Sequence, residues 1–407
     1  MQIVLVQRER KCIMSRSQIV KATSLATCFS VASILFSSHA GGGFASGNQA
    51  NNFYINSGWP AVFSAVLAMA LLTFGITQAL KMYMTRGLNG YAELFKELWA
   101  PYSWVEIFVE IFYYVMFIVG ISTSIAGAAS AFDQFFGVPY IIGALIISIV
   151  VLAIVIFGAT VLRIAASAMT IIILVTALTI YIFGIMKGQY SAADFMSASM
   201  AADGFSKVPH AIIQSFAYAG FQMFAVPALI GVSGALTDGK AASRSMIISF
   251  VMNAVALSLS CIMLMMWQPY YTSVEKGTTL PVLTSLQSMN VPILTVLYTI
   301  CLILCMISTA STGVFGLTNK FIEKKPFVNM KSERTCRVIL AVIAIVLGFA
   351  LSLVGLTNLV AYGYRYCGYL SAIVIVIPLC IIGPIKNRKY IAEHGDANQN
   401  CEEITQE

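Results

Sequence analysis

The sequence predicts an all-α membrane protein in which about ten helices cross the bilayer. Of its 407 residues, 59% are hydrophobic and only 10% are charged, whereas a soluble domain carries about 25% charged residues. Its apolar segments are long and continuous, unlike the alternating short strands of a transmembrane β-barrel. A helix needs about 20 residues to cross the hydrocarbon core. These properties exclude a soluble enzyme, a nucleic-acid-binding protein and a disordered chain.

Ten apolar segments have the length and composition of membrane spans, and we number them one to ten in chain order. They cover residues 22–54, 59–84, 101–131, 138–158, 160–186, 207–236, 243–267, 291–317, 336–354 and 357–383. With both termini in the cytoplasm, the outer loops hold only Lys187, Lys207 and Lys276 of the 24 Lys and Arg residues. Most of the others fall on the cytoplasmic side, as the positive-inside rule requires. We therefore expect a multi-pass protein of the plasma membrane.

The N-terminal segment allows a second interpretation. Basic residues precede an apolar run that ends at Ser38-His39-Ala40, an arrangement that resembles a signal peptide with its cleavage site. Cleavage there would leave nine spans and invert every loop, which would spoil the distribution of basic residues. We keep the ten-span interpretation because it accounts for that distribution.

The ten spans divide into two halves that enter the membrane from opposite sides. Five is an odd number of crossings, so the second half is inverted relative to the first, which is the geometry of an inverted repeat. We expect a cytoplasmic N-terminal tail (1–21), a first five-helix repeat (22–186), an outer connecting segment (187–206), a second five-helix repeat (207–383) and a cytoplasmic C-terminal tail (384–407). Residues 85–100 are expected to form an amphipathic inner helix, and residues 278–290 an outer lid.

The first span of each half carries residues that weaken a helix near its middle. Span one contains Gly41-Gly42-Gly43-Phe44-Ala45-Ser46-Gly47, which we call the glycine segment, and span six contains Tyr218-Ala219-Gly220-Phe221-Gln222 followed by Pro227. A glycine in a helix interior costs about 1 kcal/mol relative to alanine. Unwound backbone is tolerated at membrane depth only where protein or a water-filled cavity satisfies it. Two facing breaks predict a binding site at the midplane. The alternative for span one is a GxxxG packing motif made by Gly43 and Gly47.

The glycine segment, followed by Asn48-Gln49, Phe53-Tyr54 and Gly58, resembles the first-span signature of the YkvI-type bacterial membrane proteins. Those proteins belong to the amino acid–polyamine–organocation superfamily, and the resemblance implies a LeuT-like fold of five plus five helices with broken first and sixth helices. Weaker similarity appears at Phe157-Gly158 and at Tyr218 to Gln222. Two positions depart from the family's pattern: Gln49 stands where an acidic residue is usual, and Gln222 where Asn is usual.

The resemblance implies a site for an amino acid or related small solute between spans one, three, six and eight. Its substrate-binding residues would be Gly41, Gly42, Gly43, Phe44, Ala45, Ser46, Gly47, Tyr218, Phe221 and Gln222. It also implies a coupling sodium ion, held by the hydroxyls of Ser311 and Thr312 and by carbonyls near Ser37, Ala40 and Ser308. No other cofactor is expected. The alternative for the two hydroxyls is back-bonding within their own helix.

Physical chemistry supports the same site independently. The carbonyls of an unwound segment, together with hydroxyls, suit a hard cation such as sodium. The N–H groups of Phe44 to Gly47 are expected to attract an anionic group of the substrate. Intramembrane ionisable residues are candidates for gating or coupling, and here they are Glu110, Arg365 and His39. Snorkelling is the alternative for Arg365, and a hydrogen-bonded structural histidine is the alternative for His39.

These features lead us to expect a secondary active transporter of a small organic solute, working by alternating access with sodium or proton coupling. The alternative is a membrane sensor or scaffold that has a transporter-like fold but transports nothing. The sequence contains no HExxH or GxSxG motif, so no enzymatic activity is expected. The expected partners are a small-molecule substrate and the lipid bilayer, without nucleic acid, and the oligomeric state is left open.

Overall fold

The computed structural model describes residues 23–157, 175–322 and 333–394. Within these ranges the protein is helical and contains no β-strand. Seven helices are long and apolar enough to cross a membrane, and three shorter apolar helices, Leu25–His39, Tyr140–Ile156 and Val175–Met186, lie in predicted spans one, four and five. The prediction of a polytopic helical membrane protein is therefore confirmed.

Most predicted spans correspond to single helices with shifted ends. Spans two to four are α5 (Ala61–Arg86), α7 (Glu106–Phe136) and α8 (Tyr140–Phe157). Spans seven to nine are α13 (Gly239–Ser273), α15 (Pro292–Ile322) and α16 (Glu333–Ser352). The first part of span five, up to residue 174, lies outside the described residues, as do the N-terminal tail and the end of the C-terminal tail.

Spans one, six and ten are built from several segments each. Span one consists of α2 (Leu25–His39), α3 (Gly42–Ala45) and α4 (Asn48–Phe53). Span six consists of α11 (Val208–Gln222) and α12 (Val226–Val232). Span ten consists of α17 (Leu356–Asn358), α18 (Arg365–Ser371) and α19 (Ile377–His394), joined by π-helical turns. Because α19 continues to His394, this helix extends past the boundary that the sequence predicts at residue 383.

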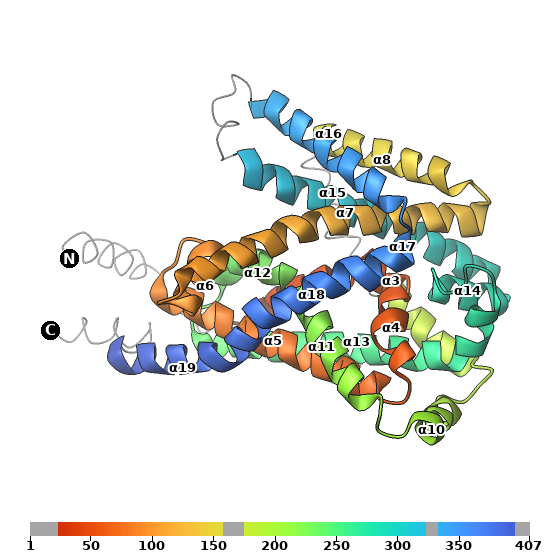
Figure 1. Cartoon of the computed structure of the whole chain (residues 1–407), viewed down its shortest axis with the longest axis horizontal. Helices are drawn as coiled ribbons and strands as arrows, with labels where there is room; N and C mark the ends of the chain where they lie inside the picture. Colours follow the sequence, from red (N-terminus) through yellow and green to blue (C-terminus); the bar gives the residue numbers. More distant parts are fainter. Residues whose placement is uncertain (1–22, 158–174, 323–332, 395–407) are drawn as a thin grey trace.

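Three short helices lie at the two ends of the long axis in Figure 1. At one end, α6 (Tyr91–Trp99) forms within the predicted amphipathic segment and buries Leu94, Phe95 and Leu98. At the other end lie α14 (Pro281–Ser288), within the predicted lid, and α10 (Ala192–Asp203), within the connecting segment. We call these the α6 end and the α14 end.

The long helices form two groups. Helices α7, α8, α15 and α16 pack against one another and make the four-helix group, in the upper part of Figure 1. Helices α2, α5, α11, α12 and α13 make the bundle group, and α18 and α19 pack against its α11 and α5. Because α3 contacts α7 and α15, the interrupted part of span one lies between the two groups.

Helices α11 and α18 approach each other so closely that their backbones touch. A Cβ atom added to Gly220 would overlap the carbonyl oxygen of Gly368, and one added to Gly368 would overlap the carbonyl oxygen of Ala217. Small residues allow membrane helices to pack at this range. The contact therefore requires glycine on both helices.

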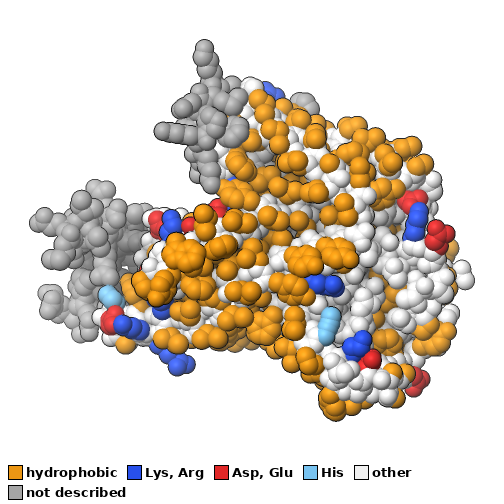
Figure 2. Space-filling view, viewed as in Figure 1, with side chains coloured by type: hydrophobic (Ala, Val, Ile, Leu, Met, Phe, Trp, Pro, Cys, Tyr) orange, Lys and Arg blue, Asp and Glu red, His pale blue; other side chains and the backbone are white. Residues whose placement is uncertain are grey.

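Apolar side chains cover the middle of the face shown in Figure 2, and charged side chains gather toward its two ends. The exposed side chains of the membrane helices include Phe63, Ile149, Val251 and Val346, each more than half exposed. Soluble monomers rarely expose apolar surface on this scale. The distribution is the one expected for a surface in contact with lipid.

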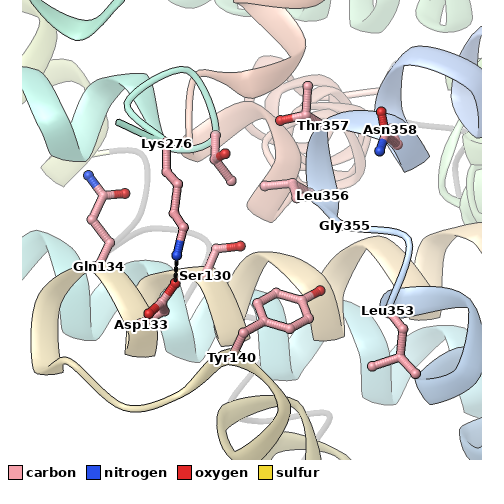
Figure 3. A pocket seen from close by; sticks show the side chains of 11 residues that line it. Ser130, Asp133, Gln134, Tyr140, Lys276, Leu353, Gly355, Leu356, Thr357 and Asn358 are labelled. Atoms are coloured by element: carbon pink, nitrogen blue, oxygen red, sulfur yellow. Dashed lines mark hydrogen bonds and ion pairs between the residues drawn. The ribbon is translucent and has the colours of Figure 1, made fainter. Parts of the chain in front are cut away.

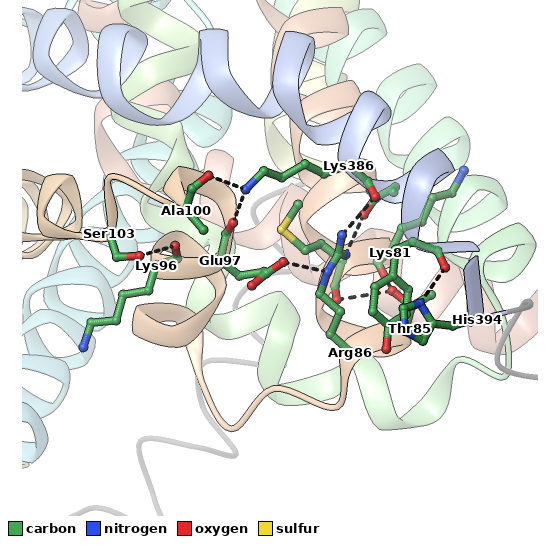
Figure 4. Close-up of polar contacts among 12 residues, drawn as sticks. Lys81, Thr85, Arg86, Lys96, Glu97, Ala100, Ser103, Lys386 and His394 are labelled. Atoms are coloured by element: carbon green, nitrogen blue, oxygen red, sulfur yellow. Dashed lines mark hydrogen bonds and ion pairs between the residues drawn. The ribbon is translucent and has the colours of Figure 1, made fainter. Parts of the chain in front are cut away.

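Polar contacts fasten α6 to α5 and α19 at the α6 end (Figure 4). Arg86, the last residue of α5, forms an ion pair with Glu97 of α6 at 3.2 Å and donates to Asn387 Oδ1 at 2.9 Å. The Nζ of Lys386 in α19 donates to the carbonyls of Glu97 and Ala100, at 2.7 and 2.9 Å. The amphipathic helix is thus held by both helices rather than by its apolar face alone.

Candidate binding site at the broken first span

Span one is interrupted twice in the glycine segment. Helix α2 ends at His39, α3 is a single turn that begins at Gly42, and α4 begins at Asn48. Before α4, Gly47 has a φ of 79°, a left-handed conformation that glycine adopts without steric cost. The predicted break is therefore present, and the segment is not a continuous GxxxG helix.

The first interruption leaves backbone groups open. Among the described residues, none accepts a hydrogen bond from the N–H groups of Gly41 to Gly43, and none donates to the carbonyls of Ser38 and His39. A continuous helix would pair such groups four residues apart. Donors and acceptors thus lie side by side at the contact between the two helix groups.

The open N–H groups are not the ones that the sequence predicts. The N–H groups of Phe44 to Gly47 all bond to carbonyls of the preceding turn, at 3.0 Å. The short turn of α3 satisfies these N–H groups, because they bond to carbonyls of Gly41, Gly42 and Phe44 within the same turn. The groups that remain open belong to Gly41, Gly42 and Gly43.

Span six changes from an α-helix to a tighter 3₁₀ turn, whereas span one unwinds. Helix α11 continues through Gln222, which is buried, and a 3₁₀ turn at Met223–Ala225 leads into α12. Pro227 has no N–H to offer the carbonyl of Met223, four residues earlier. That carbonyl instead accepts from the N–H of Val226, within the 3₁₀ turn, and from the hydroxyl of Tyr113 in α7 at 3.1 Å. The interruption therefore follows the predicted Tyr218–Gln222 segment directly, and its freed carbonyl is already bonded.

Side chains of α15 cover the unwound turn of span one. A Cβ atom added to Gly42 would overlap the sulfur of Met306, and one added to Gly41 would lie 3.6 Å from Oγ1 of Thr309. The hydroxyl of Tyr298 donates to the carbonyl of Ala45 at 2.7 Å. The four-helix group thus contacts the glycine segment at Gly41, Gly42 and Ala45.

Aromatic rings from spans one, six and ten pack together beside the break. The rings of Tyr218 and Phe221 have centroids 4.8 Å apart, and Phe221 stacks on Tyr364 of span ten at the same separation. The hydroxyl of Tyr364 is 2.6 Å from Oγ1 of Thr123 in α7. The ring of His39 lies between those of Tyr218 and Phe44, with its centroid 5.7 Å from that of Tyr218 and 4.8 Å from that of Phe44. The structure therefore assembles the aromatic residues that the sequence assigned to the site.

Contacts from two other segments cover the site at the α14 end. The backbone N–H of Val282 in α14 donates to the carbonyl of Ser46 at 3.3 Å. The side-chain amide of Asn48 donates to the carbonyl of Thr279 at 2.9 Å and to Oγ1 of Thr357 at 3.1 Å. The predicted lid and the start of span ten thus both bind the second half of span one.

A cavity of about 340 Å³ lies at the α14 end (Figure 3). The end of α7, the loop at Lys276–Thr279 and the start of span ten line it, and Lys276 forms an ion pair with Asp133 at 2.8 Å. None of the predicted substrate-binding residues lines this cavity.

The predicted hydroxyl ligands of sodium do not come together. Thr309 faces Gly41, whereas Ser311 lies two residues further along α15, so its side chain leaves the helix about 200° away. Ser311 is buried with no hydrogen-bond partner among the described residues, and Thr312 is exposed. Neighbouring residues of an α-helix project about 100° apart, so the hydroxyls of Ser311 and Thr312 point in different directions. The structure therefore favours Thr309 as the hydroxyl at the break.

The predicted carbonyl ligands lie around the same break. The carbonyl of Ala40 faces α15, where it accepts a weak hydrogen bond from Sγ of Cys305 at 3.9 Å. The side chain of Ser37 is exposed near the end of α2, and Ser308 is half-buried in α15. Of the three predicted carbonyl ligands, Ala40 is thus the one for which a bond between span one and α15 is seen.

His39 is a buried histidine with both ring nitrogens bonded. Its Nδ1 is 2.7 Å from Oδ1 of Asn253 in α13, and its Nε2 is 2.8 Å from the hydroxyl of Tyr218 in α11. The Tyr218 hydroxyl also lies 3.1 Å from Oε1 of Gln49. This network links spans one, six and seven and agrees with a hydrogen-bonded structural histidine. A proton-binding role stays a prediction.

Glu110 forms an ion pair near the α6 end. Its Oε2 is 2.9 Å from Nζ of Lys320, and the hydroxyl of Tyr91 donates to its Oε1 at 2.6 Å. Burial, and then the hydrogen bond to Glu110, raises the pKa of the Tyr91 phenol well above its ordinary value. Lys320, which the sequence places in an inner loop, belongs to α15 and also lies over the ring of Tyr114 at 4.3 Å. These contacts make Glu110 a paired charge joining α6, α7 and α15.

Arg365 has partners within the protein. Its guanidinium donates to the carbonyl of Asn52 at 2.9 Å and lies 5.5 Å from the ring centroid of Phe53. Its Nε is buried and has no hydrogen-bond partner in the described part of the chain. The sequence suggests either snorkelling or an outer gate, whereas the side chain joins span ten to the second half of span one.

Several residues of the site have no sequence pattern that marks them as functional. Met306, Thr309 and Tyr298 read as ordinary residues of an apolar span. Asn48 could have been found, because it begins the amide-rich run to Asn52 inside a span, and polar groups at membrane depth need partners.

No protein-family model matches the chain, and no curated protein matches it in sequence. Solved structures do match its architecture. MhsT in complex with L-phenylalanine has a TM-score of 0.58 and 14% identity, with 88% of this chain and 97% of that chain covered. The chain has the LeuT fold.

Two other solved transporters agree with this assignment. A Na⁺-coupled sialic acid symporter has a TM-score of 0.59 and 12% identity, covering 88% of this chain and 90% of that chain. Inward-facing Mhp1 has a TM-score of 0.57 and 12% identity, covering 92% and 94%. Identities this low establish the fold alone. The interruptions of spans one and six therefore occur within a LeuT fold.

Proposed function

We propose that the protein is a secondary active transporter of an amino acid or a related zwitterionic solute, working by alternating access. The observation that carries the proposal is the unwound turn between His39 and Gly42, at the contact of the two helix groups. Its open N–H groups suit a carboxylate, and its open carbonyls suit an ammonium group or a cation. Such a pair of charges on one small solute would satisfy both sets.

The finer assignments belong to the same proposal. One similar structure contains L-phenylalanine and another is a sodium-coupled sialic acid symporter. The glycine segment resembles the YkvI-type proteins, which favours an amino acid as the solute. In this proposal the protein carries its substrate across the plasma membrane and does not convert it chemically.

We infer that the α6 end faces the cytoplasm. Arg86, Lys320 and Lys386 lie toward that end, whereas Lys276 lies at the α14 end. This distribution follows the positive-inside rule. In this orientation α14 and the start of span ten cover the site from the outside.

Two cations are candidates for coupling. Sodium would bind open carbonyls of the break together with the hydroxyl of Thr309, since it prefers oxygen ligands. A proton would bind His39, the titratable residue next to the break. Glu110 is less suited to this role because it is paired with Lys320.

The test is uptake into proteoliposomes. The probes are radiolabelled L-alanine, L-leucine, L-phenylalanine, L-glutamate and L-lysine, supplied with an inward sodium gradient, an inward proton gradient or no gradient. We expect at least one of them to accumulate against its own gradient when one cation gradient is imposed. A folded, reconstituted protein that moves none of them would favour the sensor or scaffold interpretation.

Two threonine variants distinguish the coupling ions. If sodium drives uptake, Thr309→Val should remove the sodium dependence, whereas Thr312→Val, one turn further and exposed, should retain it. Uptake that follows the proton gradient and ignores sodium would contradict the sodium site and point to His39.

A further inference from the structure

Met306 lies between two glycines that belong to different helices. A Cβ atom added to Gly42 of α3 would overlap its sulfur, and one added to Gly127 of α7 would overlap its methyl group. Met306 belongs to α15 and is 1% exposed. Its side chain therefore fills a space that three helices leave open, at the contact between the two helix groups.

This arrangement is unfavourable if its purpose is packing alone. Gly127 lies in the interior of the 31-residue helix α7, where glycine costs about 1 kcal/mol relative to alanine. Ordering a buried methionine side chain costs roughly 1.5–2 kcal/mol of conformational entropy. Alanine at the glycine and a smaller residue at position 306 would fill comparable volume without either cost. The chain instead keeps space that a flexible, unbranched side chain occupies.

Other contacts between methionine and glycine in the described chain have a simpler form. Met263 lies against Gly184, and Met266 lies against Gly188. Met223 lies against Gly75 in the same way, and none of these three methionines is among the nearest neighbours of a glycine in the glycine segment. Within the described residues, Met306 alone bridges two glycines, and one of the two is part of the open turn of span one.

We propose that Met306 sets the size of the substrate side chain, and that the substrate is an L-amino acid with an aliphatic side chain of about the size of leucine. This inference rests on the proposed function. With its carboxylate on the open N–H groups of Gly41 to Gly43, the substrate would direct its side chain into the space beside Gly42. That space holds the Cγ, Sδ and Cε atoms of Met306.

If the Met306 side chain rotates away, the apolar side chain of the substrate would take its place beside Gly42. The space that Met306 leaves lies between the bare backbones of Gly42 and Gly127, and Leu356 borders it, with Cδ2 3.7 Å from a Cβ added to Gly127. The three atoms that would leave, Cγ, Sδ and Cε, are as many as the branched end of a leucine side chain contains and half as many as a phenyl ring contains. An apolar pocket of this kind rejects charged side chains because it leaves them unpaired.

The test compares kcat/KM for L-leucine, L-phenylalanine and L-alanine uptake in matched variants. Met306→Ala enlarges the pocket, and we expect the ratio of L-phenylalanine to L-leucine to rise about tenfold or more, the usual scale for discrimination by a hydrophobic pocket. Gly127→Ala narrows it, and the ratio of L-alanine to L-leucine should rise by about the same factor. Combining the two substitutions should return both ratios toward the wild-type values.

Met263→Ala is the matched control, because it truncates a buried methionine that contacts a glycine away from the break. It should lower thermal stability while leaving the substrate ratios unchanged. Ratios measured within one preparation do not depend on the fraction of folded protein.

An unchanged ratio of L-phenylalanine to L-leucine in active Met306→Ala would overturn this inference and leave the proposed function standing. A wild-type protein that transports no amino acid would remove both. Met306→Leu, which conserves volume but restricts rotation, serves if the alanine variant does not fold. It should lower the turnover of L-leucine several-fold, and wild-type turnover would contradict the inference.

Discussion

The first spans of the two repeats are interrupted at comparable positions but by different means. Span one separates completely between His39 and Gly42, where three consecutive glycines leave the helix without side chains to stabilise it. Span six only tightens into a 3₁₀ turn before Pro227. Consecutive glycines weaken a helix over several residues, whereas a proline removes one donor at one position.

The consequence is a difference in what each interruption offers to a ligand. The break in span one leaves several N–H groups and carbonyls open among the described residues. The carbonyl of Met223, which Pro227 cannot bond, is occupied by the N–H of Val226 and the hydroxyl of Tyr113. Binding groups therefore come from the backbone in span one and from the side chains of Tyr218 and Phe221 in span six.

The largest expected effect is on the open turn of span one. Gly42→Leu should abolish uptake while the protein still inserts and elutes as a monodisperse species, because the side chain would occupy the space of Met306 and cover the open N–H groups. Gly42→Ala should reduce uptake less, and adding Met306→Ala should restore part of it. Normal uptake kinetics in a well-folded Gly42→Leu variant would show that the turn is not the binding site.

The next effect concerns span six. Tyr113→Phe removes one of the two donors to the carbonyl of Met223, the other being the N–H of Val226, so the free energy of unfolding should fall by about 0.5–1.5 kcal/mol. Adding Pro227→Ala supplies an N–H four residues on and should recover part of the loss, as thermal unfolding in detergent would measure. If Pro227→Ala lowers stability further in this background, the carbonyl is not the group that Tyr113 satisfies.

A smaller effect is expected where span ten meets the second half of span one. Arg365→Gln loses a charge-assisted bond to the Asn52 carbonyl and a cation–π contact with Phe53, so unfolding free energy should fall by about 1–2 kcal/mol. An Arg365 that only snorkels or serves as a gate, the roles that the sequence suggests, would lose almost nothing. Thermal unfolding without ligand separates these outcomes, and an unchanged melting temperature would favour the sequence-based expectation.

The smallest effect concerns the ion pair at the α14 end. The hydrogen bond from Lys276 to Asp133 raises the pKa of the lysine above its ordinary value of 10.5. A raised pKa means that the pair stabilises the folded protein at neutral pH and that this contribution is lost as the pH rises through the folded value. Because the lysine is exposed, Lys276→Ala should shift the melting temperature only slightly, and less at high salt. A salt-independent shift would contradict this account.

Hydropathy and glycine content predict the spans and the break because both depend on local composition. The open N–H groups are harder to place, because the turn of α3 satisfies Phe44 to Gly47 by itself. The choice between Thr309 and Ser311 depends on the rotation of α15, which packing against α7 determines. The meeting of Met306 with Gly127 joins residues far apart in the chain, and no short pattern encodes it.

The backbone contact between α11 and α18 has a consequence for how distances change during the cycle. Since Gly220 and Gly368 leave no room between the two helices, we expect them to move as one body, with the four-helix group moving separately. Spin labels at exposed Ile212 and Tyr366 should therefore give one narrow distance distribution in every state. A pair at Ile212 and Leu304, which joins α11 to α15, should give two populations whose proportions change when substrate is added.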